Sequence, residues 1–265
     1  MFNFMENQSV NRAFFKAKLN LSNFIYAQSF FYEFIKKHEN IKIDLLIDYL
    51  DKKERTLLLD WILSTKLFDK IYFKPKILFS FSKLKRELRI NNYGDLIFDL
   101  NLDTQKETPL LNIPKDWMIA TKLNFLKWGI NDNIRLNRKV IFINTYTNNF
   151  KKTISISKIF DFIDNLSSDD NFYNTIFVIN SDLKTYKKYE KVFKNLAQHN
   201  TFLFVLTHNF FQLASMIILS DLIISVDSFI LDIANANKKQ TIQVPNFYSG
   251  QVVDDLIKKL STINY

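Results

Sequence analysis

The chain has 265 residues, of which 47% are hydrophobic and 24% charged, and this length and composition predict one large or two modest folded domains. It has no cysteine and only three histidines, which lack the H-x-x-x-H spacing, so disulfides, thiolate sites and a catalytic zinc site are excluded or disfavoured. Its three glycines form neither a G-x-G-x-x-G nor a P-loop motif, which argues against dehydrogenases, kinases and ATPases.

The first part of the chain alternates short apolar runs with stretches of helical period. Strands are predicted at residues 13–20, 41–48, 69–73 and 95–101, and helices at 22–38, 52–65 and 81–92. Ser22 or Asn23 is expected to cap the first of these helices. The alternation is typical of β-α-β units, so we expect a compact sheet domain.

Residues 101–137 show no clean period and hold two of the four prolines and one of the three glycines, so we place a domain boundary there. A second series follows, with strands at 139–146, 174–180, 201–207, 221–227 and 240–244 and helices at 155–167, 182–198, 209–220, 228–238 and 251–263. We therefore predict an α/β protein of two Rossmann-like domains, residues 1–125 and 126–265, which face a cleft.

The strand predicted at 221–227 ends in the pair Asp227-Ser228. Ligands of doubly wound sheets bind beyond the carboxyl ends of the strands, which makes Asp227 a candidate ligand-binding residue. Ser228 begins the next helix, whose N-terminus suits a phosphate group, and Asp232 follows about one turn later. The simpler interpretation is that Asp227 caps the helix and that Asp232 only interacts with the helix dipole.

The net charge of +9 predicts an anionic partner, which is a nucleic acid, a phospholipid surface or a phosphorylated substrate. A general abundance of lysine in the chain also explains this charge, so the charge alone does not select among these partners. No apolar run approaches the roughly 20 residues that span a bilayer, and the first residues do not resemble a signal peptide. A cytoplasmic location is expected.

Residues 212–241 resemble the donor-side signature of the heptosyltransferase-like glycosyltransferases (glycosyltransferase family 9). That signature reads as an ELA-type helix followed by ADL, a hydrophobic strand, DTG and a small-residue helix. The matching positions are Gln212-Leu213-Ala214, Ser220-Asp221-Leu222, Asp227-Ser228 and Ile233-Ala234-Asn235-Ala236. The order of the predicted elements agrees with this family over most of the chain.

The resemblance implies the two-domain glycosyltransferase B type of fold, with the nucleotide sugar bound by the carboxyl-terminal domain. It implies a bacterial enzyme that transfers a sugar from a nucleotide diphosphate donor to a surface glycan, such as a lipooligosaccharide core, with inversion. The family needs no metal and no cofactor, and an acceptor of this kind is compatible with peripheral contact with the anionic inner face of the membrane. Carried over by position, the donor-binding residues are Asn144, Thr145, Lys151, Lys152, Asp227, Ser228 and Asp232.

The sequence departs from the family at three of its functional positions. Asn23 stands where the family has the aspartate proposed as general base, Phe229 replaces the glycine of DTG, and Asp232 replaces a histidine. Other acids that could serve as the base are Asp99, Asp103 and Glu33.

Three hypotheses follow from the sequence. The first is a glycosyltransferase, and the second is a catalytically degenerate member of the same fold that acts as a binding or interaction protein. The third is a nucleic-acid-binding α/β protein, which ranks last because the basic residues are scattered and no recognition motif occurs.

Overall fold

The computed structural model divides the chain into two compact units, Met1–Asn112 and Ile113–Tyr265, which are described one at a time. The structure describes residues 12–38, 41–48, 52–74, 97–100, 111, 113–145, 156–167, 172, 174–181, 183–196, 200–205 and 210–244.

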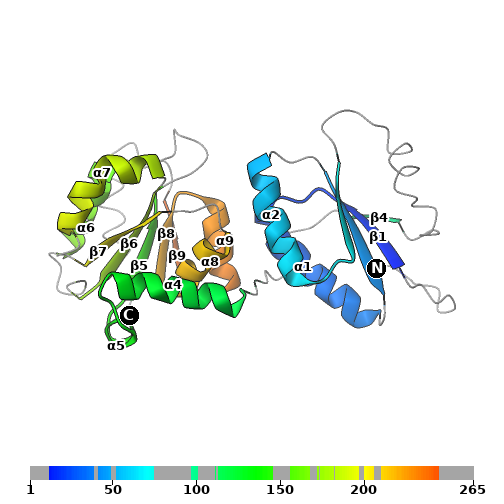
Figure 1. Ribbon diagram of the computed structural model, residues 1–265, viewed down its shortest axis with the longest axis horizontal. Coiled ribbons are helices and arrows are strands. Elements are labelled where there is room, and N and C mark those ends of the chain that lie inside the picture. Colours follow the sequence, from blue (N-terminus) through cyan, green and yellow to red (C-terminus); the bar gives the residue numbers. More distant parts are fainter. Residues whose placement is uncertain are drawn as a thin grey trace. The chain divides into compact units, whose positions relative to one another are not determined.

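The first unit is built around a parallel sheet with the described strand order β3-β2-β1-β4 (Figure 1). Its strands are β1 (Arg12–Ala17), β2 (Lys42–Ile47), β3 (Lys70–Phe73) and β4 (Ile97–Leu100), and its helices are α1 (Leu21–Lys37) and α2 (Lys52–Thr65). The chain adds β2 and β3 on one side of β1 and then returns to place β4 on the other side. The order of the sheet therefore reverses between β1 and β4.

Aromatic side chains fill the core of this unit. Phe15 of β1 is buried and packs edge-on against Phe31 and Phe34 of α1, with Phe98 of β4 stacked on it. Such offset and edge-to-face ring pairs stabilise a core beyond the area that they bury. The abundance of phenylalanine in the sequence is thus used in packing β1 against its neighbours.

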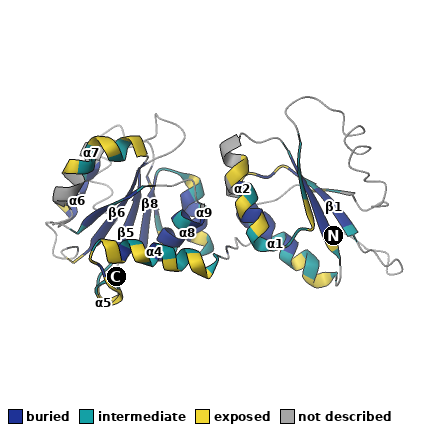
Figure 2. Cartoon of the chain, in the orientation of Figure 1, coloured by how far each residue is buried: buried dark blue, intermediate teal, exposed yellow. Residues whose placement is uncertain are grey.

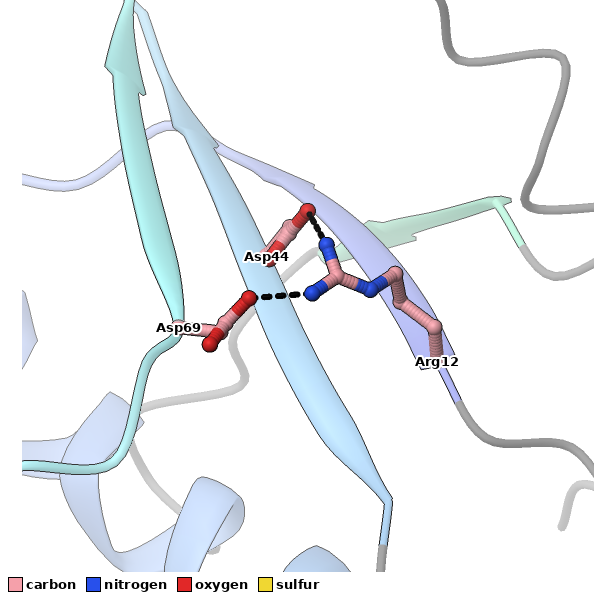
Figure 3. A network of polar contacts seen from close by, with 3 residues as sticks. All are labelled: Arg12, Asp44 and Asp69. Atoms are coloured by element: carbon pink, nitrogen blue, oxygen red, sulfur yellow. Dashed lines mark hydrogen bonds and ion pairs between the residues drawn. The ribbon is translucent and has the colours of Figure 1, made fainter.

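Three charged side chains meet at the amino ends of the first three strands (Figure 3). Arg12, which begins β1, donates to Asp44 of β2 over 3.0 Å between Nη1 and Oδ2, and its Nη2 contacts Asp69 just before β3. Asp44 is fully buried. Burial raises the pKa of the Asp44 carboxyl, and the charge of Arg12 opposes this rise.

The second unit contains a five-stranded parallel sheet with the order β7-β6-β5-β8-β9. The strands are β5 (Val140–Asn144), β6 (Ile176–Ser181), β7 (Thr201–Val205), β8 (Leu222–Ser225) and β9 (Gln240–Gln243), and the helices are α4 (Lys115–Lys127), α5 (Asp132–Leu136), α6 (Ile156–Ser167), α7 (Leu183–Leu196), α8 (Phe210–Ile218) and α9 (Ser228–Ala236). The chain winds outward from β5 through β7 and then returns to start β8 beside β5.

Helices cover both faces of this second sheet. One face packs against α6 and part of α7, where Ile143 and Ile224 lie in the same core cluster as Phe162. Successive strand residues point to opposite faces, and Phe202, on the other face, stacks on Trp128 at the end of α4. Helix α4 packs on α8, which in turn packs on α9. The unit is therefore doubly wound, as the sequence predicts.

The stretch 101–137, for which no regular structure is predicted, contains the helices α4 and α5. Helix α4 shows no clean helical period because apolar residues lie on both of its faces, with Phe125 buried and Leu123 exposed. Since α4 packs on α8, it belongs to the second unit, and the division falls after Asn112 rather than at the predicted residue 125.

The structure also bears on the predicted cap of α1 and on two further predicted helices. The cap of α1 is Asn20, not Ser22 or Asn23, because the Asn20 side chain accepts from the backbone N–H of Asn23 over 2.8 Å. The helices predicted at 81–92 and 251–263 lie outside the described residues.

Candidate functional site

The second sheet reverses its strand order between β5 and β8. In open α/β sheets ligands bind outside the carboxyl ends of the strands at such a reversal. At this edge Asn144, the last residue of β5, stands in register with Asn180 of β6 on one side and with Ser225 of β8 on the other. The three residues are adjacent across the sheet, and we call them the polar row.

Hydrogen bonds connect the members of the polar row. Asn180 donates from Nδ2 to Asn144 Oδ1 over 2.7 Å, and Asn144 donates from Nδ2 to Ser225 Oγ over 3.1 Å. All three residues are at most 2% exposed. Each follows an isoleucine of the core shared with α6, so the row projects from the opposite face of the sheet.

One atom of the row keeps an unused hydrogen-bonding capacity. Asn180 Oδ1 is buried and has no hydrogen-bond partner among the described residues. Buried acceptors of this kind are usually satisfied by protein or by ordered water. Thr145, predicted as a donor-binding residue, is buried as well, and its hydroxyl donates to the Asn180 backbone carbonyl over 3.0 Å. Asn144 and Thr145 therefore lie beneath the surface of the sheet edge.

Ser225 links the row to Asp227. Its hydroxyl donates to the Asp227 carbonyl and accepts from the Asp227 backbone N–H, both over 2.9 Å. The carboxylate of Asp227 accepts from the Phe229 backbone N–H over 2.9 Å, which makes Asp227 the N-cap of α9. Asp227 is half-buried, so the row fixes a carboxylate that reaches the surface at the reversal of the sheet.

Helix α9 presents a polar side at this edge. Ile230, Leu231, Ile233 and Ala234 are its buried residues. Ser228 and Asp232 stand at the spacing i and i+4, so both lie on one side of the helix, with Ser228 exposed and Asp232 half-buried. The first N–H groups of a helix have no intrahelical acceptor and attract anions.

Phe229 occupies the position of the family's glycine without backbone strain. It lies within α9, and it is not among the described residues with positive φ. Glycine is required only where the backbone adopts such a conformation or where another group approaches it closely. The conformation of this helix start therefore does not depend on glycine.

The other predicted residues of the first unit occupy separate places. Asp99 of β4 is exposed and accepts from Lys16 of β1 over 3.0 Å, at the carboxyl edge where this sheet reverses. Asn23 lies in the first turn of α1, whereas Glu33 is exposed about 15 Å further along the same helix. Among the described candidates of the first unit, Asp99 and Asn23 thus lie at the carboxyl edge and Glu33 does not.

Both groups of the Asn23 carboxamide are used in local structure. Its Oδ1 accepts from the Asn20 backbone N–H over 2.7 Å, and its Nδ2 donates to the Lys18 carbonyl over 2.9 Å. We expect Asn23→Asp to lower the free energy of unfolding by about 1–2 kcal/mol, because a carboxylate oxygen would face the Lys18 carbonyl. Urea denaturation measures this change.

Asn20→Asp is the matched control, because the Asn20 side chain only accepts in the capping box and an aspartate caps equally well. It is expected to leave stability unchanged. Equal stability of the Asn23→Asp chain and the wild type would contradict the structural role of the amide.

Lys151, Lys152 and Asp103 lie outside the described residues. Asn180 and Ser225 were not predicted as site residues, although the sequence contains the pattern that identifies them. The buried strands β5 and β6 each carry an Ile-Asn pair at or near their carboxyl ends, and β8 ends in Ile-Ile-Ser. Polar residues at the ends of neighbouring buried strands meet at one sheet edge.

Among the described residues, no group of three acidic or histidine side chains is placed to hold a metal ion.

Comparison with solved structures supports the fold across nearly the whole chain. A glycosyl transferase of family 9 from Veillonella parvula DSM 2008 matches with a TM-score of 0.62 at 14% identity, covering 97% of this chain and 92% of that chain. The E. coli ADP-heptose LPS heptosyltransferase II matches with a TM-score of 0.54 at 11% identity, over 87% and 84% of the two chains.

A third similar structure is the UDP-GlcNAc 2-epimerase from Neisseria meningitidis bound to UDP-GlcNAc, with a TM-score of 0.54 at 12% identity over 95% of this chain and 92% of that chain. Neither a family model nor a curated protein matches the sequence. The similarity thus lies in the fold, and the resemblance to family 9 predicted from the sequence is confirmed at that level. The chain has the α/β fold, with parallel sheets, of the glycosyltransferases of the B type.

Proposed function

We propose that the protein is a glycosyltransferase that transfers a sugar from a nucleoside diphosphate donor to a surface glycan such as a lipooligosaccharide core. The observation that carries this proposal is the placement of Asp227, which follows the end of β8 by two residues at the reversal of the sheet and caps α9. Two proteins of similar fold are named for ADP-heptose or bound to UDP-GlcNAc, which are nucleoside diphosphate sugars. We propose a cytoplasmic location for this reaction.

Each residue at this edge is assigned a role by its chemistry. The N–H groups of the first turn of α9, with the Ser228 hydroxyl, hold the donor diphosphate. The carboxylate of Asp227 accepts hydrogen bonds from hydroxyls of the donor sugar. Lys151 and Lys152, which follow β5 along the chain, neutralise the diphosphate, whereas Asp232 faces hydroxyl groups of the donor, since a carboxylate repels phosphate.

The reaction is a displacement at the anomeric carbon of the donor, proposed to proceed with inversion and without a metal ion. The acceptor hydroxyl oxygen bonds to that carbon as the bond to the phosphate oxygen breaks, and the electron pair leaves with the nucleoside diphosphate. Fixed N–H donors and cations stabilise the charge that develops on the leaving group. The hydroxyl proton passes to a base, a role that we assign to Asp99 because it lies at the carboxyl edge of the first sheet.

A second candidate function is favoured by one observation. Asn23 stands where the family's base is expected, and its amide is engaged in the turn before α1. An amide does not accept a proton at neutral pH. The alternative is therefore a protein that binds the nucleotide sugar without transferring it.

The melting temperature of the full chain is expected to rise by about 5 °C with one class of nucleotide sugar at a hundredfold excess over its Kd, because the ligand binds only the folded state. The panel contains the ADP, UDP, GDP and CMP sugars and the free nucleotides. Asp227→Ala is expected to abolish this rise. Acceptor-dependent release of nucleoside diphosphate then separates the transferase from the binding protein.

Asp227→Ala also removes a helix cap, so it needs a control that loses a cap elsewhere. Asn131→Ala is suitable, because Asn131 caps α5, before the amino end of β5, by accepting from the Ile134 N–H over 2.9 Å. Either substitution alone costs about 1 kcal/mol. Only Asp227→Ala is expected to lose the rise with ligand. An unchanged melting temperature of the wild type with every nucleotide and nucleotide sugar would reject the donor site.

A further inference from the structure

Helix α4 is apolar on the side that faces solvent as well as on its buried side. Ile119, Leu123 and Leu126 are 58%, 50% and 54% exposed, although they are large hydrophobic residues. They follow the spacing i, i+4 and i+7, so they form one line along the helix, which we call the α4 stripe. Figure 2 shows exposed positions along α4 beside its buried ones.

The side of α4 opposite the stripe is already used in packing. Thr121 and Phe125 are its buried residues, and Trp117 stacks on Phe211 of α8. An exposed apolar line on a helix that is otherwise packed needs a partner, since soluble surfaces rarely keep large contiguous apolar patches.

Lysines border the α4 stripe on both sides. With 100° between successive residues, Lys115 and Lys122 lie on one side of the line and Lys127 on the other. Lys122 is also 3.8 Å from Asp132 of α5, and Asp116 adds a second acid near the stripe. The three lysines and Arg135 outnumber these two acids. Leu136, the residue after Arg135, is another large hydrophobic side chain at this surface and is 72% exposed. The surface is apolar at its centre and cationic at its margins.

A helix with an apolar line between lysines fits the interface of an anionic bilayer. The apolar side chains enter the boundary of the acyl chains, while the lysine stems extend so that their charges reach anionic headgroups. A second copy of the chain placed on this surface would bring together two surfaces that each carry an excess of positive charge. No helix in the described part of the chain is long and apolar enough to cross a membrane.

We infer that the α4 stripe rests on an anionic lipid surface. This inference deepens the proposed function. The purpose of the contact rests on that function, because a glycolipid acceptor is reached at a membrane. The contact itself follows from the exposure and charge of α4 and can be measured without turnover.

The test is co-sedimentation of the full chain with vesicles of phosphatidylglycerol and phosphatidylethanolamine, compared with phosphatidylcholine vesicles. We expect binding to the anionic vesicles that weakens as salt is added. Replacing Ile119, Leu123 and Leu126 together by serine is expected to reduce the ratio of bound to free protein about tenfold or more, and Lys115→Gln with Lys127→Gln about thirtyfold. The matched control replaces Leu63 of α2 and Leu183 of α7, which are 57% and 55% exposed, by serine and is expected to bind like the wild type.

Absence of binding to anionic vesicles, or equal binding by the triple serine variant, overturns the inference. So does a melting temperature of that variant several degrees below the wild type, because the stripe would then be packed against another part of the chain. A dimer that the triple variant converts to a monomer would place a second copy on the stripe. A nucleotide-induced rise in melting temperature that survives in a chain with no vesicle binding leaves the donor site standing and rejects this contact alone.

Discussion

Replacing Arg12 with leucine is expected to lower the free energy of unfolding by about 3 kcal/mol, because the substitution leaves the Asp44 carboxylate buried without its guanidinium partner. Asp44 is fully buried, whereas Arg12 is partly exposed. Most of the cost therefore comes from the stranded carboxylate and little from the lost packing of arginine. Urea denaturation at neutral pH measures the difference.

The decrease in the free energy of unfolding caused by Arg12→Leu is expected to become smaller as the pH is lowered. Burial raises the pKa of the Asp44 carboxyl above 3.8, its ordinary value, and the Arg12 charge opposes that rise. A carboxyl with a higher pKa in the folded chain than in the unfolded chain binds its proton more tightly when folded. Its contribution to stability therefore increases as the pH falls from above the folded pKa to below the unfolded pKa. Without Arg12 the pKa of Asp44 in the folded chain rises further, so the pH range over which acid stabilises the variant becomes wider. The difference in free energy of unfolding between variant and wild type should therefore be smaller at about pH 5 than at about pH 7.5.

Lys16→Leu is the matched control on the same strand. Lys16 also pairs with an aspartate over 3.0 Å, but that residue, Asp99, is 69% exposed. Exposed pairs of this kind contribute at most about 1 kcal/mol. An equal loss in the two variants, or a loss in Arg12→Leu that does not change with pH, would contradict the role assigned to the buried carboxylate.

Asn144→Ala is expected to lower the free energy of unfolding by about 2–3 kcal/mol and to abolish the rise in melting temperature with nucleotide sugar. The substitution removes the acceptor of the Asn180 amide and the donor to Ser225. Asn180 Oδ1 has no partner among the described residues, so the remaining carboxamide would be buried without any side-chain bond from the row. Ser225 would keep its bonds to the Asp227 backbone but lose the bond that ties it to the rest of the row.

A double replacement separates stability from binding in this row. Substituting both Asn144 and Asn180 with leucine removes both ends of the bond, and such paired apolar replacement costs little. We expect the double variant to recover most of the stability lost in Asn144→Ala without recovering the response to ligand. Thr121→Val is the control, since the buried Thr121 hydroxyl has no partner among the described residues and its removal should be neutral or stabilising. A full ligand response in Asn144→Ala would show that the row has no part in the site.

The regular elements were predictable where one physical pattern acted alone. Three strands of the second unit, β5, β6 and β8, are short and buried on both faces, so their apolar runs identify them. Helix α2 begins and ends at the predicted residues, 52 and 65. The fold class followed from the alternation of these elements and is confirmed.

The predictions were incomplete where tertiary contacts decide the outcome. Apolar residues on both sides of α4 remove its period, and the partner of its buried side, α8, lies far along the chain. Ser22 and Asn23 are as suitable for a helix cap as Asn20 by residue type, and the backbone geometry before α1 selects Asn20. The polar row depends on the register of three strands, and no single segment contains that information.

The reversal of the second sheet also has a kinetic consequence. The bond from Asn144 to Ser225 joins residues 81 positions apart, whereas β5, β6 and β7 pair with successive neighbours along the chain. Closing a long loop costs entropy before its contacts form, so pairings between distant segments tend to form late in folding. The edge that carries Asp227 is therefore completed only when β8 joins the sheet, and during synthesis this step must wait until the chain has been made beyond residue 225.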